Sequence, residues 1–240
     1  MKYEDGQWFM QGVSRNHPDR LKSPDELITF VDRVGFLPLF GNEIDGFSVE
    51  DWVCPSDWWT ENPETDPWEW RCIAARSGKV AYGKFFGKKA GFVSLKWLPC
   101  FVNYRRDGYD FDSRYEEGLA KRREHLIMEL FESHEELASY EIKSMAGFGK
   151  GGEKNFSGIV TDLQMQMYLT ITDFRRRKNK RGQEYGMPVT VYATPETLYG
   201  EELVTSAYRE EPEESWQKIL RHMEQNYPDA TEAEIRAICR

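Results

Sequence analysis

Residues 153–194 read EKNFSGIVTDLQMQMYLTITDFRRRKNKRGQEYGMPVTVYAT. Apolar residues recur at helical spacing from Phe156 to Met167, which predicts a helix. Residues 168–174 and 188–194 are rich in Thr, Val and aromatic residues, as strands usually are. The stretch between them, RRRKNKRGQEYG, is basic and contains glycine. The order predicted is therefore a helix, a strand, a basic turn and a second strand.

Two further helical patterns precede this segment. Residues 112–134 carry an apolar stripe and predict one long helix, with Leu119 among its inward-facing positions. A shorter helix is predicted from Ser139 to a stop at Gly147. Three helices followed by a hairpin are typical of a winged helix, so we expect a winged-helix domain over 112–194. A helical C-terminal segment, 195–240, should follow it, with a capping box at Thr231.

The first half of the chain shows a related pattern. Ser23 and Pro24 open a predicted helix that Gly35 ends. The strings KVAYGKFF and GFVSL flank a Gly-Lys turn and predict a β-hairpin over 79–95. We therefore expect an irregular lead-in over 1–23 and an N-terminal winged-helix-like domain over 24–111 with a Trp-rich insert. The fold class expected is α+β, mainly helical, with tandem winged-helix-like domains.

Composition restricts the class of protein. The chain has 240 residues, 40% of them hydrophobic, and a formal net charge of −9. Its four cysteines form no CxxC pair and its four histidines are widely spaced, so we expect neither a disulfide framework nor a metal site. Apolar runs are too short for a membrane span and the first residues lack a signal-peptide core. A soluble cytoplasmic protein without a cofactor is predicted.

The basic turn is the strongest functional feature. Six of the seven residues 175–181 are cations, although the chain as a whole is acidic. Such a cluster suits the phosphates of double-stranded DNA, whereas a solvated loop kept polar for solubility is the alternative. Lys154 would add to the cluster, and an exposed Gln164 could contact a base edge. The predicted nucleic-acid contacts are Arg175, Arg176, Arg177, Lys178, Lys180, Arg181, Lys154 and Gln164.

A second candidate site lies in the Trp-rich insert and the first hairpin. Trp68, Trp70, Arg71 and Lys84 could line a ligand pocket. The alternative is a core plug in which Arg71 pairs with an acid, while Lys84 lies at the surface. The chain contains no GxSxG, Walker loop or HExxH motif, so catalytic residues stay unassigned.

Several strings together resemble the AlkZ-related proteins, a group similar to the AlkZ-type winged-helix DNA glycosylases that unhook alkylated purines and crosslinks. The resemblance covers about residues 24–200 in order. It is carried by VGFLPL (34–39), WEWR (68–71), YGKFF (82–86), RRDGYDFD (105–112), LQMQMYL (163–169) and YATPE (192–196). It implies a DNA-facing surface on a winged-helix scaffold.

The chain departs from the glycosylases at their catalytic motif. Those enzymes place a Gln-x-Gln or Gln-x-Asp pair just after the glycine that ends the first helix. Here the corresponding residues 36–39 are Phe-Leu-Pro-Leu, which cannot transfer protons. We therefore expect DNA binding without glycosylase activity. Two alternatives stay open: a diverged glycosylase using Asp66, Glu69 or Lys84, and a protein-interaction module using the Trp block or the acidic C-terminal helices.

Overall fold

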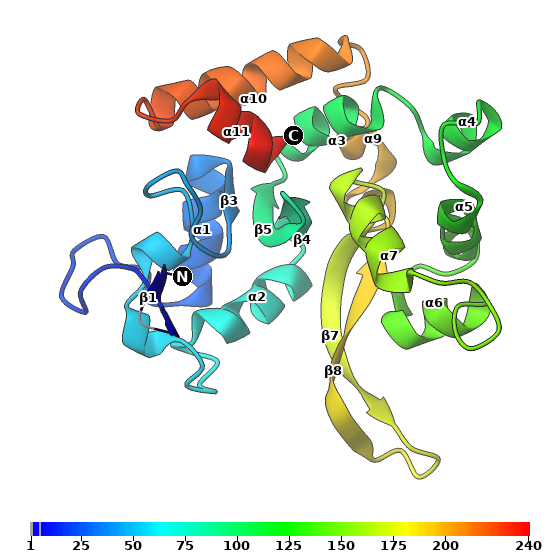
Figure 1. The fold of residues 1–240 in the computed structure, drawn as a ribbon, viewed down its shortest axis with the longest axis horizontal. Helices are drawn as coiled ribbons and strands as arrows, with labels where there is room; N and C mark the ends of the chain where they lie inside the picture. The colour runs from blue at the N-terminus through cyan, green and yellow to red at the C-terminus, as the bar shows by residue number, and fades with distance from the viewer. Residues whose placement is uncertain (1, 5) are drawn as a thin grey trace.

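The computed structural model describes residues 2–4 and 6–240 (Figure 1). Helices alternate with two three-stranded antiparallel sheets, and a short antiparallel pair, β1 (Lys2–Glu4) with β2 (Gln7–Phe9), precedes them. The mixed fold predicted from the sequence is confirmed. The lead-in is not wholly irregular, since it contains this short pair.

The first three-stranded sheet belongs to the N-terminal half. The helices and strands of this half are α1 (Pro24–Val34), β3 (Phe36–Pro38), the 3₁₀ turns η1 (Glu50–Trp52) and η2 (Pro55–Asp57), α2 (Pro67–Arg76), β4 (Val80–Phe86), β5 (Lys89–Ser94) and α3 (Leu98–Arg106). The strand order is β3-β5-β4, so the predicted hairpin over 79–95 is confirmed. Helix α1 begins as predicted, because the Ser23 hydroxyl accepts from the Glu26 amide and Pro24 occupies the first turn.

The second half repeats this arrangement. Its elements are α4 (Phe111–Glu116), α5 (Arg122–Met128), η3 (Glu129–Glu132), β6 (Leu137–Ala138), α6 (Ser139–Met145), α7 (Phe156–Met165), β7 (Thr170–Lys178) and β8 (Glu184–Ala193). The strand order is β6-β8-β7. In both sheets the first strand therefore pairs with the last.

Two predicted boundaries in this half are wrong. The single helix expected over 112–134 is broken between α4 and α5, where Gly118 adopts φ +76°, and Leu119 is 51% exposed instead of inward. A left-handed glycine ends a helix because it costs no steric strain there. The second hairpin is longer than expected, since Arg175–Lys178 belong to β7 and only residues 179–183 form the turn.

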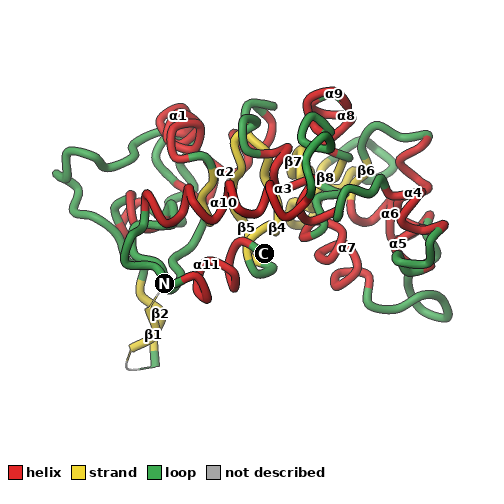
Figure 2. The backbone as a smooth tube through the Cα atoms, turned by 90° about the horizontal axis from the view of Figure 1, so that it is seen from above, coloured by secondary structure: helices red, strands yellow, loops and turns green. Residues whose placement is uncertain are grey.

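The C-terminal segment covers α3. It contains α8 (Pro195–Tyr199), α9 (Glu201–Val204), α10 (Pro212–Asn226) and α11 (Glu232–Cys239), with the predicted capping box at Thr231 present. Helix α10 lies along α3, where Asn103 donates to the Ser215 hydroxyl at 3.0 Å and Tyr104 stacks on Trp216 at 5.0 Å between ring centroids (Figure 2). None of the helices in the described residues is long and apolar enough to cross a bilayer.

One hydrophobic core runs through both halves. Phe36, Phe86 and Phe101 pack against one another in the N-terminal half, and Leu163 and Met167 belong to the same buried cluster. Backbone-to-side-chain contacts cross between the halves as well, since the Thr170 hydroxyl donates to the Tyr82 carbonyl at 2.9 Å. The division into domains at residue 111 stays a prediction.

Candidate nucleic-acid interface

The β7–β8 hairpin projects away from the rest of the molecule (Figure 1). Its turn is ordered by Asn179, whose side-chain oxygen accepts from the amides of Arg181 (2.9 Å) and Gln183 (3.1 Å). Gly182 takes φ +77° in this turn. Strand pairing continues to Lys178 opposite Glu184, so the cations lie on a paired ribbon and not on an irregular loop.

The base of the hairpin is attached to α2 through Asp173. Arg76 forms an ion pair with this carboxylate and also donates to the Phe174 carbonyl at 3.1 Å. Arg175 contacts the other carboxylate oxygen at 2.7 Å and forms a further ion pair with Glu136. Burial raises the pKa of Asp173, but hydrogen bonds from Arg76 and Arg175 outweigh it and the net pKa is lowered. Arg175 is therefore a neutralised structural contact of the hairpin base.

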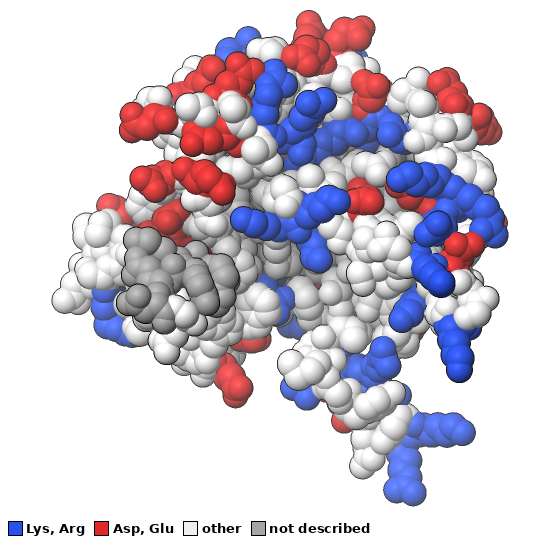
Figure 3. Space-filling view, viewed as in Figure 1, with Lys and Arg blue, Asp and Glu red and all other residues white. Residues whose placement is uncertain are grey.

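The outer cations are different. Lys178, Lys180 and Arg181 are exposed, and no ion pair with another described residue neutralises them. Arg176 donates to the Gly186 carbonyl at 3.2 Å, and Arg177 lies over the Tyr140 ring at 5.0 Å from its centroid. Figure 3 shows Lys and Arg at the hairpin and over the side of α6 and α7, whereas Asp and Glu dominate over α10 and α11. The hairpin is thus an exposed positive arm on an acidic molecule.

Two exposed apolar residues accompany these cations on β8. Met187 is 81% exposed and Tyr185 is 50% exposed. The strand register shifts here, since Arg175 pairs with Val189 but Arg177 pairs with Tyr185, so Met187 lies within the irregularity and Tyr185 at its edge. Bulky apolar side chains beside cations on a narrow ribbon suit insertion into a groove of DNA. The predicted DNA contacts do not include these two residues, although large apolar residues beside Gly186 and Pro188 in a polar hairpin are a signal for them.

The third helix, α7, is largely covered. It packs between β4 of the first half and α5 of its own half. Gln164 is only 1% exposed; its side chain accepts from the Lys84 amide at 3.0 Å and donates to the Val160 carbonyl at 3.0 Å. The prediction that Gln164 is exposed is therefore wrong, because contact with β4 buries it. Lys154, just before the helix, is exposed.

The aromatic residues of the insert fill their own space. Arg71 is sandwiched between the rings of Trp68 (3.7 Å) and Phe174 (4.2 Å), while Trp70 is fully buried and donates to the Glu64 carbonyl. Within the described residues Arg71 pairs with no carboxylate, which corrects the expected acid partner. A guanidinium between two aromatic faces is held by cation–π attraction instead. Lys84 lies apart from this stack.

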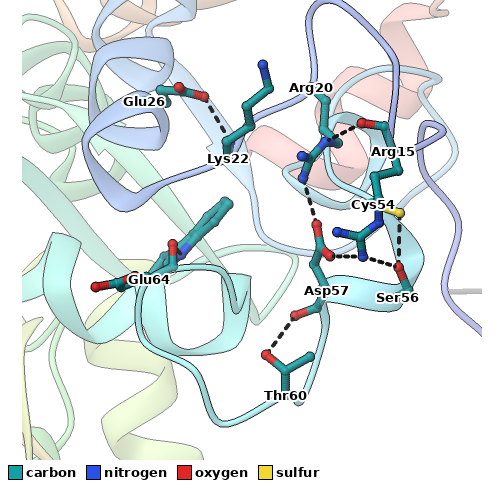
Figure 4. A network of polar contacts seen from close by, with 10 residues as sticks. Arg15, Arg20, Lys22, Glu26, Cys54, Ser56, Asp57, Thr60 and Glu64 are labelled. Atoms are coloured by element: carbon teal, nitrogen blue, oxygen red, sulfur yellow. Dashed lines mark hydrogen bonds and ion pairs between the residues drawn. The ribbon is translucent and has the colours of Figure 1, made fainter.

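The insert also holds the N-terminal segment in place. The buried carboxylate of Asp57 accepts from Arg15 and from Arg20, each at 2.7 Å, and Arg20 also donates to the Arg15 carbonyl (Figure 4). Asp57 thus stabilises the path of residues 15–20 across the Trp block. These polar contacts are structural.

One of the residues considered for catalysis, Asp66, has structural partners. Asp66 caps α2, and its carboxylate accepts from the amides of Trp59, Glu61 and Trp68 at 2.9–3.1 Å. Residues 36–39, where the glycosylases carry their catalytic pair by resemblance, are all buried. No group of three or more metal-ligating side chains occurs within the described part of the chain.

Lys84 lines a polar cleft whose other lining residues belong to the second half. This cleft, called the Lys84 cleft below, has a volume of about 290 Å³. Lys84 comes from β4, Lys143 from α6 and Arg177 from β7, and the cleft also contains serine and threonine hydroxyls from α6, α7 and β8. The structure therefore joins one residue of the predicted pocket, Lys84, with one of the predicted DNA contacts, Arg177.

A family model described as AlkZ related matches residues 21–240. The chain belongs to the AlkZ-related family. The resemblance seen in the sequence is confirmed, and the match extends through α10 and α11 beyond the region expected. Membership in the AlkZ-related family makes the chain a relative of DNA-repair glycosylases. A comparison with curated proteins found no match.

Proposed function

We propose that this AlkZ-related protein binds double-stranded DNA through the β7–β8 hairpin and does not hydrolyse glycosidic bonds. The observation that carries the proposal is the group of exposed, unneutralised cations on a projecting ribbon in a chain of net charge −9. The surface of an acidic molecule as a whole repels a polyanion. Such a molecule can still bind a polyanion through one positively charged region.

The order of elements supports a winged-helix assignment for each half. In the second half, α5 is followed by β6, α6, α7, β7 and β8, and β6 pairs with β8. In the first half, α1, β3, α2, β4 and β5 follow a similar order, and β3 pairs with β5. We assign the wing of the second half to the β7–β8 hairpin, with tandem domains over 24–111 and 112–194.

The mode of binding follows from what each element exposes. Helix α7 cannot enter a major groove along its length, because β4 covers it and Gln164 is buried. The hairpin is free, and its cations would contact phosphates while Met187 and Tyr185 enter a groove. Phosphate contacts fix position without reading bases, so we expect binding with little sequence preference.

The test is an anisotropy titration with a fluorescein-labelled DNA duplex at several salt concentrations. Replacing Lys178, Lys180 and Arg181 by Gln should weaken binding and reduce the slope of log K against log salt by about 2 to 3. A control that replaces Lys96, Arg209 and Arg221 by Gln makes the same charge change at exposed positions away from the hairpin. Equal effects of the two triple variants would contradict hairpin-directed binding.

The absence of catalysis is tested separately. The proposal is supported by the apolar, buried residues 36–39 and by the capping role of Asp66. A panel of alkylated duplexes incubated with the protein should release no free base, as followed by chromatography. Release that is lost in Asp66→Asn, Glu69→Gln or Lys84→Gln would overturn this part of the proposal and leave the DNA-binding part standing.

A further inference from the structure

The Lys84 cleft has the composition of an anion site. Three cations from three different elements, Lys84, Lys143 and Arg177, line it, and no carboxylate is among its lining residues. Neither lysine amine forms an ion pair with a described residue, and both side chains are exposed. Like charges gathered without a counter-charge repel one another, so an anion that entered the cleft would relieve this repulsion.

A threonine of α7 at the cleft wall has a hydroxyl that no other described residue bonds. Thr161 is 9% exposed and lines the cleft, and its hydroxyl makes no hydrogen bond within the described residues. Thr29 in α1 and Thr205, just after α9, instead bond to the carbonyl four residues earlier. This hydroxyl is not among the fully buried atoms that lack a partner, so it reaches the solvent of the cleft and can bond to a ligand there.

The first turn of α7 adds to this positive field. Ser157 of that turn lines the cleft, and the N-cap residue Asn155, at φ +66°, makes no side-chain capping bond. The amides that open a helix carry partial positive charge and commonly bind phosphate oxygens. Ser157 thus brings this end of α7 to a cleft that the three cations and Thr161 also line.

We propose that the Lys84 cleft holds one phosphate of the DNA backbone. This inference rests on the proposed function, since Arg177 belongs both to the cleft and to the hairpin that would hold the duplex. A phosphate fits better than an extruded base, because Arg177 already occupies a face of the Tyr140 ring on which a base would stack. Lys84 comes from the first half and Lys143 from the second, so one phosphate would bind both halves together.

The test uses Lys84→Gln and Lys143→Gln, singly and together, in the same duplex titration. Both lysines are exposed and form no ion pair within the described residues, so the variants should fold, as unchanged melting temperatures would show. Each single variant should weaken binding several-fold. The double variant should reduce the salt slope by about 1 and not 2, because both amines address the same phosphate. Lys22→Gln with Lys96→Gln is the matched control and should leave the slope unchanged.

The outcomes separate the two proposals. Wild-type binding with an unaltered slope in the double variant would overturn the cleft assignment but not hairpin binding. No duplex binding by the wild type would overturn the proposed function and with it a DNA phosphate in the cleft. In that event inorganic phosphate is the second probe: saturable shifts of the Ser157 and Thr161 amide resonances that vanish in the double variant would assign the cleft to a free phosphate.

Discussion

The hairpins β4–β5 and β7–β8 have the same place in their halves, since each follows a helix and pairs with a shorter, earlier strand. Their surroundings differ. Along β4 every residue except Lys84 is buried, whereas β7 is exposed from Arg175 onward and β8 from Glu184 to Pro188. One ribbon has become a packing surface and the other a projecting arm.

The side chains explain this difference. Phe85, Phe86 and Phe92 belong to the core in the first hairpin. The glycine pair Gly83 and Gly91 leaves room for the rings of Phe85 and Phe86. The outer part of the second hairpin is rich in cations, with Tyr185 and Met187 as its large apolar residues, so it has no continuous apolar face to bury. Strand pairing needs only backbone groups, so two paired strands can continue beyond the core where their side chains are polar.

The largest expected loss of stability concerns Arg105, which hydrogen-bonds to the buried β4–β5 hairpin. This guanidinium donates to the carbonyls of Phe85 (2.6 Å), Cys239 (2.8 Å) and Met165 (3.3 Å). Burial lowers the pKa of Arg105 to about 10, and the carbonyls at the ends of α7 and α11 supply negative partial charge. Arg105→Met leaves these acceptors unpaired and should cost about 3 kcal/mol in the free energy of unfolding, measured with urea.

The exposed Arg209 is the matched control for that change. Arg209→Met should alter the free energy of unfolding by no more than about 0.5 kcal/mol. Similar losses in the two variants would show that Arg105 does not hold the covered hairpin in place.

One glycine in each hairpin allows the tightness of packing around the two backbones to be compared. A Cβ at Gly91 would come within 2.4 Å of the Phe86 ring and 2.8 Å of the Leu37 carbonyl, so Gly91→Ala should cost about 2 kcal/mol. At Gly182 a Cβ meets open space and only φ +77° opposes it, so Gly182→Ala should cost about 1 kcal/mol. Thermal denaturation of both variants measures the difference. A larger loss at Gly182 would reverse our account of which hairpin is tightly packed.

Alkaline pH tests the junction between the hairpins. Tyr82 of β4 packs against Phe92 and Phe174, and burial raises its pKa to about 12. The unfolded state loses this phenol proton near pH 10 and the folded state near 12, so stability is full below pH 10 and falls as pH rises through 12. From pH 9 to 11 the free energy of unfolding of Tyr82→Phe should therefore fall by about 1 kcal/mol less than that of the wild type.

The exposed hairpin again provides the control, because Tyr185 is 50% exposed. Urea unfolding of Tyr185→Phe across the same pH range should follow the wild-type curve. If the pH dependence of stability in Tyr82→Phe also matched the wild type, the loss of stability at alkaline pH would come from another residue.

The smallest effect on stability is expected at Met187, the most exposed large apolar residue of the hairpin arm. Met187→Ala should change the free energy of unfolding by less than about 0.5 kcal/mol. If this side chain enters a DNA groove, the same variant should bind the labelled duplex several-fold more weakly. Unchanged affinity would restrict the role of the arm to its cations.

Local signals in the sequence were sufficient for the presence of both hairpins and for the start of two helices, but not for the helix break at Gly118 or the length of the second hairpin. Ser23 and Thr231 cap helices as their residue types predict, and the alternation of Thr, Val and aromatic residues marks β7 and β8. Contacts between the halves had no such signal. Gln164 is buried by Lys84, 80 positions earlier, and Arg71 is held by Phe174 from the other half. The Lys84 cleft depends on the same long-range packing, so its three cations could not be grouped from their sequence positions.

The ion pair between Arg76 and Asp173 has a mechanical consequence. It joins the base of the projecting hairpin to a helix of the opposite half, so the position of that helix contributes to the direction of the hairpin. Because the tip around residue 181 is far from this contact, a small rotation of α2 would displace the tip by a larger distance.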